Sequence, residues 1–368
     1  MTARRRRFIA KTGNDLRGGM TLVELLVAFV ILLMIIGALV SLTTRSLESW
    51  TEGETRKERY DRARTVLDAL VSDLRNLYVE NEIFLDGQKV LLPPILACDL
   101  DRNRAPRLRF VRSGHPSVVK VPAGTGAPAR LLPPMYYGAT WEIAYVPDPE
   151  PERAVLWRAV RPFDRQPTAA SLLRPPPHYN RASDGFGSRF VPVESGVLWV
   201  GYRFWTQFTT TWDDAHPVRR VGPRSRQPSG PERRWDSWRR DDKEFFFHRR
   251  AFDPTNPDFV YPEIVAISVT VEGAGPETHG VRLLESCDER SSVLRLTHTQ
   301  GLPDPPSFVK IGAEWIEYAG KTSTELTGLR RGRRDTAAAP HPAGAALRFG
   351  ETFTTEVRLP VYREAQEP

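Results

Sequence analysis

Cysteine and histidine are scarce in this chain, and their scarcity excludes several kinds of site. Among 368 residues there are two cysteines, Cys98 and Cys287, and seven scattered histidines. Two thiols exclude a disulfide framework and a four-thiolate zinc site, but they leave one bridge open if the chain is exported. The sequence has no HExxH, EF-hand or CxxC motif. We therefore predict no metal site, no cofactor and no catalytic residue.

Net positive charge is also small outside the N-terminus, where acidic residues balance most of the basic ones. The chain has a net charge of +7, but residues 1–19 hold six basic residues and one acid. This leader contributes +5 and leaves +2 for the other 349 residues. A nucleic-acid-binding domain carries clustered basic residues on its folded body, so we expect no nucleic-acid partner. Two basic tracts, residues 233–240 and 330–334, are interpreted as solvent-exposed loops or turns.

A long apolar run follows the basic leader. Residues 25–42 are eighteen residues without a charge, close to the about 20 that a membrane-spanning helix needs. Basic residues before the run place the leader in the cytoplasm. A general secretory signal peptide fits poorly, because its apolar region of about 7–15 residues precedes the small residues of the cleavage site. Here the small residues Gly18 and Gly19 come first.

The apolar segment begins with a carboxylate, Glu24. A charge inside the bilayer costs about 2.5 kcal/mol or more, so we expect Glu24 to have a partner. The sequence GMTLVE at residues 19–24, followed by an uninterrupted apolar helix, resembles the type IV prepilin signal. The resemblance implies that a prepilin peptidase cuts between Gly19 and Met20 and methylates the new amine of Met20. It also implies that Glu24 pairs with the N-terminal ammonium of a neighbouring subunit in a filament.

The helical pattern continues beyond the apolar run. Residues 1–92 contain no proline, so we predict one helix from about residue 20 to about residue 81, roughly 90 Å long at 1.5 Å per residue. Its soluble half has an apolar face, made of Leu67, Leu70, Val71, Leu74, Leu77 and Tyr78. The predicted polar face carries Arg62, Arg64, Asp68, Asp73 and Arg75.

Short runs of alternating apolar residues follow, separated by proline and glycine, which is typical of antiparallel strands. We expect strands near residues 108–111, 141–145, 155–160, 197–204, 265–271 and 353–359, and two more around Gly312 and Ala313. On the strand at 197–204 we place Leu198, Val200, Tyr202 and Phe204 on one face. A long helix followed only by strands predicts the α+β class.

The order of these strand motifs is similar to that of the J-type minor pseudopilins of type II secretion systems. The motifs that carry the resemblance are LRFVR at 108–112, LWR at 156–158, RFW at 203–205 with a further tryptophan at 212, and PEIVAISV at 262–269. The resemblance implies a pseudopilin-like fold, with the membrane-spanning first half of the helix followed by a half that packs on an antiparallel sheet.

The predicted domains follow from these patterns. They are a leader at 1–19, a transmembrane segment at 20–42, the soluble part of the helix at 43–82, a periplasmic β domain at 83–272 and 351–368, and an inserted small β module at 273–350. A second insertion at 213–258 is rich in arginine, aspartate and tryptophan.

The resemblance implies a non-enzymatic subunit of the inner membrane, with a single span and its C-terminal domain in the periplasm. Its expected partners are the I- and K-type minor pseudopilins and the major pseudopilin, and the expected role is to initiate pseudopilus assembly for protein export. Two alternatives stay open: a minor pilin of a type IV pilus, and a membrane-anchored periplasmic enzyme or binding protein.

Overall fold

The computed structural model describes residues 21–78, 82–85, 88–91, 96–101, 103–114, 140–162, 172, 190–205, 233–236, 261–273 and 280–360. The predicted leader and the processing residues Gly19 and Met20 lie outside this part, as does most of the insertion at 213–258. The chain divides into two units, residues 1–54 and residues 55–368.

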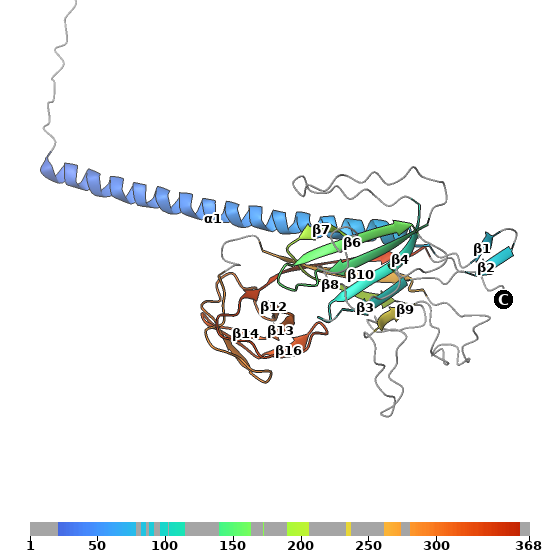
Figure 1. Ribbon diagram of the computed structural model, residues 1–368. Helices are drawn as coiled ribbons and strands as arrows, with labels where there is room; N and C mark the ends of the chain where they lie inside the picture. The colour runs from blue at the N-terminus through green and yellow to red at the C-terminus, as the bar shows by residue number, and fades with distance from the viewer. Residues whose placement is uncertain are drawn as a thin grey trace, which may run out of the picture. The chain divides into compact units, whose positions relative to one another are not determined.

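One long helix, α1 (Leu22–Arg75), opens the described chain and passes from the first unit into the second (Figure 1). Its first part is apolar and long enough to cross a membrane. The helix ends at Arg75, six residues before the predicted end. The backbone leaves the helix there because the next residues pair with a strand: Leu77 forms an antiparallel bridge with Arg112, and the Tyr78 N–H donates to the Val111 carbonyl (2.9 Å).

The largest sheet has six antiparallel strands in the order β7-β6-β5-β4-β3-β9. The strands are β3 (Leu96–Leu100), β4 (Pro106–Ser113), β5 (Thr140–Pro147), β6 (Val155–Pro162), β7 (Phe190–Ser195) and β9 (Arg233–Asp236). β9 lies in the tract that we expected to be a solvent-exposed loop. That expectation is wrong for residues 233–236, because Trp235 is buried and its ring lies 4.8 Å from the ring of Phe204.

A second antiparallel sheet has the order β18-β10-β8, with β8 (Val197–Trp205), β10 (Ile264–Glu272) and β18 (Gly350–Arg358). The helix packs against both sheets through one hydrophobic cluster that includes Val66, Leu70 and Leu74. A hairpin of β1 (Glu82–Leu85) and β2 (Gln88–Leu91) precedes the first sheet. The long helix and the antiparallel sheets establish the α+β class.

The chain between β10 and β18 forms a small β module with a hydrophobic cluster of its own (Figure 1). Its two sheets have the orders β16-β13-β12-β17 and β11-β15-β14. The strands are β11 (Val293–Arg295), β12 (Ser307–Ile311), β13 (Glu314–Tyr318), β14 (Gly320–Lys321), β15 (Glu325–Thr327), β16 (Arg330–Arg333) and β17 (Leu347–Arg348). The two strands expected around Gly312 and Ala313 are β12 and β13, which confirms that prediction.

Candidate functional site

The start of α1 carries the candidate assembly residue Glu24. Its carboxylate accepts from the Thr21 N–H (3.0 Å) and from the Thr21 hydroxyl (3.1 Å), and the Glu24 N–H donates to the Thr21 hydroxyl (3.3 Å). This is a capping box, in which the side chains at the first and fourth positions satisfy each other's backbone N–H groups. The sequence TLVE at residues 21–24 matches the S/T-x-x-E signature of a capping box. The resemblance to prepilins had implied only an intermolecular role for Glu24.

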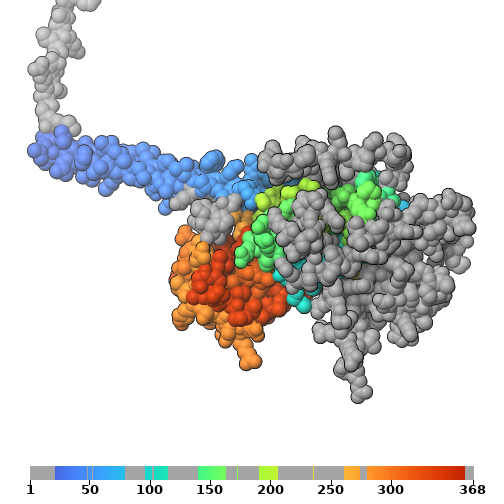
Figure 2. All heavy atoms as spheres, viewed as in Figure 1, coloured from blue at the N-terminus to red at the C-terminus, as the bar shows by residue number. Residues whose placement is uncertain are grey.

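The side chains after Glu24 form an exposed apolar surface within the first unit. Figure 2 shows this part of the helix in blue. Every large hydrophobic residue from Leu22 to Leu42 is at least 42% exposed, far more than a water-soluble surface tolerates in one patch. Such a surface fits a helix that could span a membrane. Glu24 is the only charged residue in the segment 22–42.

A buried carboxylate, Asp73, fixes the soluble half of the helix to the six-stranded sheet. It accepts from Arg158 Nε (2.7 Å) and Nη2 (2.9 Å), from the Tyr145 hydroxyl (2.7 Å) and from Arg112. Asp73 is fully buried, so its predicted place on the polar face is wrong. Burial and the adjacent Asp73 charge raise the pKa of Tyr145 well above its usual value, so Tyr145 acts as a neutral hydrogen-bond donor.

A second buried carboxylate, Asp99, holds the pair β3 and β4 together. Arg107 donates to it from Nε (2.9 Å) and Nη2 (2.8 Å), and Arg109 donates from Nη2 (2.7 Å). All three residues are buried. As in the Asp73 cluster, several donors satisfy the buried carboxylate. Asp99 therefore has a structural role.

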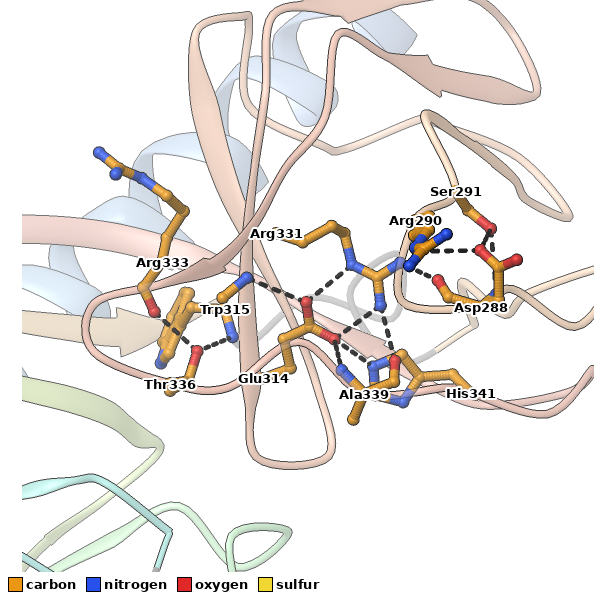
Figure 3. Close-up of polar contacts among 11 residues, drawn as sticks. Asp288, Arg290, Ser291, Glu314, Trp315, Arg331, Arg333, Thr336, Ala339 and His341 are labelled. Carbon is orange, nitrogen blue, oxygen red and sulfur yellow. Dashed lines mark hydrogen bonds and ion pairs between the residues drawn. The ribbon is translucent and has the colours of Figure 1, made fainter.

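The module is organised around Glu314 (Figure 3). Arg331 donates to its carboxylate from Nε (2.7 Å) and Nη2 (2.8 Å), and His341 Nε2 lies 2.7 Å from Oε2. The backbone N–H groups of Gly332 and Ala339 add two more bonds, each 3.1 Å long. Burial alone raises the pKa of Glu314, but these hydrogen bonds, led by that from Arg331, lower it to about 2.

Our expectation that residues 330–334 form a turn with solvated arginines is therefore wrong for the backbone and for Arg331 and Arg334, whereas Arg330 and Arg333 are exposed as expected. Residues 330–333 are strand β16, and the Arg331 side chain is only 8% exposed. Arg334 lies against the rings of Trp199, Phe308 and Trp315, at 4.3, 4.6 and 4.1 Å from guanidinium carbon to ring centroid. The sequence alone does not show which arginines of such a run are buried and which are exposed to solvent.

Three basic side chains of the module bind the rest of the second unit. Arg348 donates to Glu272 of β10 from Nε (2.7 Å) and Nη2 (2.5 Å). Arg334 donates to the hydroxyls of Thr270 (2.8 Å) and Thr352 (3.2 Å), and Lys310 donates to backbone carbonyls. These contacts hold the module against the sheet β18-β10-β8.

The candidate disulfide residues lie in different places. Cys98 belongs to the hydrophobic cluster shared by helix and sheets, and Cys287 belongs to the cluster of the module. Both thiols are buried, and they are not joined by a disulfide bond. Within the described ranges, no group of three or more histidine, cysteine, aspartate or glutamate side chains is arranged to hold a metal ion.

No family model matches the chain, and a search of curated proteins found no similar sequence.

Proposed function

We propose that the protein is a minor pseudopilin, a structural subunit at the tip of a type II secretion pseudopilus that initiates pseudopilus assembly for protein export. It would be cut between Gly19 and Met20, methylated at Met20 and held in the inner membrane by the first part of α1. Its periplasmic domain would bind the I- and K-type minor pseudopilins and the major pseudopilin. The structural role of this subunit requires no catalytic residue.

The observation that carries the proposal is the combination at the start of α1. A helix that is apolar enough to cross a membrane has a single carboxylate in its first turn, at the end of the sequence GMTLVE. The capping box gives this carboxylate hydrogen-bond donors within its own chain, and it satisfies backbone N–H groups at the helix start. It does not remove the negative charge, which still needs a cation when the segment lies in lipid.

Support also comes from the second half of the helix. The buried contacts of Asp73 with Arg112, Arg158 and Tyr145 anchor the soluble part of α1 to the six-stranded sheet. A subunit that assembles through its helix needs such an anchor, because contacts made by the helix would otherwise not be transmitted to the globular domain.

Three variants separate the charge of Glu24 from its capping role. Glu24→Gln keeps a side chain that can complete a capping box but removes the charge, and Glu24→Ala removes both. Thr21→Ala removes the capping hydroxyl and keeps the charge. Each variant is co-expressed with the prepilin peptidase and the sibling pseudopilins, and the membrane extract is then purified through a tag on this subunit.

We expect Glu24→Gln and Glu24→Ala to be cleaved normally but to lose the sibling pseudopilins, whereas Thr21→Ala retains them. Asp68→Asn serves as the control for loss of an exposed helix carboxylate, since Asp68 pairs only with the exposed Arg64 among the described contacts. Co-purification of the siblings with Glu24→Gln at the level of the unchanged protein would contradict the assembly role of the charge.

A further inference from the structure

A small, partly open cavity lies within the second unit, where the module meets the sheet. Its volume is about 40 Å³, and its walls include Lys310 of β12, Trp199 of β8, and Arg334 and Thr336 after β16. A single water needs roughly 10–15 Å³ of such space. The cavity therefore has room for a few water-sized particles, and is too small for an organic metabolite.

Three cationic residues line this cavity, and two of them, Lys310 and Arg334, have no carboxylate partner in the part of the chain that the structure describes. Lys310 is 8% exposed, and its ammonium donates to the carbonyls of Pro151 and Leu198, both at 3.3 Å. Arg334 donates only to the two threonine hydroxyls and lies on three aromatic rings. Burying a charge is costly unless an opposite charge accompanies it.

A third donor in the wall lacks an acceptor. The indole N–H of Trp199 is buried and makes no hydrogen bond, although an indole N–H can only donate. The ring has this position because Gly201 has no side chain, and a Cβ at residue 201 would overlap it. The same ring supports the guanidinium of Arg334. The indole N–H is thus a donor without an acceptor, beside two cations that have hydrogen-bond acceptors but no ion-pair partner.

Two carboxylates, Asp148 and Glu150, also line the cavity, and these two and the nearby Glu272 and Asp101 have other hydrogen-bond or ion-pair partners. Asp148 accepts from the Trp157 indole (2.9 Å), Glu150 pairs with Arg153, Glu272 pairs with Arg348, and Asp101 accepts from the backbone of Asn103 and Ala105. These groups reduce the positive potential of the cavity, but none lies within ion-pair distance of Lys310 or Arg334.

We propose that this cavity binds a small monovalent anion of the size of chloride, held by Lys310, Arg334 and the indole N–H of Trp199. A water molecule would satisfy the indole but would leave both cations uncompensated, whereas an anion satisfies all three groups. The anion completes the contact between module and sheet, so the docking of the module depends on it. This inference is independent of the proposed role in secretion.

The test is halide binding by the full-length protein in detergent. We expect a saturable broadening of the chloride NMR line that added bromide displaces. Lys310→Met should bind about tenfold more weakly or worse, which is the scale of loss when one partner of a buried charge pair is removed. Lys321→Met is the matched control, because Lys321 bonds Leu302 and Asp304 and does not line the cavity.

Crystals grown in bromide provide a second measurement that does not depend on a variant. We expect an anomalous peak inside the cavity, between Lys310 and Trp199. Chloride line broadening that is the same in the unchanged protein, Lys310→Met and Lys321→Met would overturn the proposal. So would bromide peaks confined to the protein surface.

Discussion

At the residue scale, Asp73 shows how one buried charge fixes a helix on a sheet. Its carboxylate is fully buried, and two arginines and a tyrosine donate to it. A buried ion pair of this kind stabilises a fold little more than apolar packing would. Removal of one partner is nevertheless costly, because it leaves the other charges buried and uncompensated. Asp73 is therefore the residue of the soluble helix at which loss of charge should have the largest effect.

We predict that Asp73→Asn lowers the free energy of unfolding by about 3–5 kcal/mol, the range for breaking a buried ion pair. Asp68→Asn, five residues earlier and exposed, should change it by less than about 1 kcal/mol. Urea unfolding of the two variants, followed by circular dichroism, makes the comparison. Equal midpoints for both would show that the Asp73 contacts do not hold the helix to the sheet.

The sequence predicted the apolar face of this helix but not the place of Asp73. Leu70 and Leu74 are buried as their spacing indicated, and Asp73 lies beside them on the same turn. Hydrophobic periodicity treats every carboxylate as exposed, whereas the arginines that bury Asp73 come from β4 and β6, far along the chain. A polar residue inside an apolar stripe is the signal that could have identified it.

At the scale of elements, most strands were predictable and their pairing was not. Alternation located β4, β5, β6, β8, β10 and β18. It placed Leu198 on the same face as Val200, which is wrong: the register between β8 and β10 shifts near Thr270 and Val271. Leu198 consequently packs with Trp315 of the module, while Val200 joins the main cluster. A bulge changes which face a residue occupies, and composition does not reveal it.

The contact between module and sheet should be pH-dependent. Burial, with the nearby Arg348 and Arg334, lowers the pKa of Lys310 from 10.5 to about 8, against the opposing effect of Asp101 and Glu272. Between these two pKa values the unfolded chain holds a proton that the folded chain has released. Stability should therefore rise with pH from about 8 to 10.5.

Urea unfolding at several pH values in a halide-free gluconate buffer measures this rise. Lys310→Met should have a flatter profile over the same interval, while Lys321→Met should keep the slope of the unchanged protein. A profile for Lys310→Met that parallels that of the unchanged protein would show that another group titrates there.

At the scale of the whole molecule, the class of the fold could be predicted because the spacing of apolar residues changes along the chain. It is helical in the N-terminal part and alternates in the part that follows. A continuous helix with an apolar first part precedes alternating strands, and the structure has that order. The inserted chain between β10 and β18 was recognisable from its length and its own strands, and the structure gives it a separate hydrophobic cluster. The cation-lined contact between this module and the sheet was not predictable, because Lys310, Arg334 and Trp199 are far apart in sequence.

The proposed role in secretion requires cleavage of the N-terminus, which lies before the described residues. The most direct measurement is the intact mass and N-terminal sequence of the membrane-extracted protein, expressed with and without a prepilin peptidase. We predict a peptidase-dependent loss of residues 1–19 that leaves an N-methylated Met20. An uncut chain in the presence of the peptidase, or cleavage beyond Leu42, would contradict the assignment to the pseudopilins.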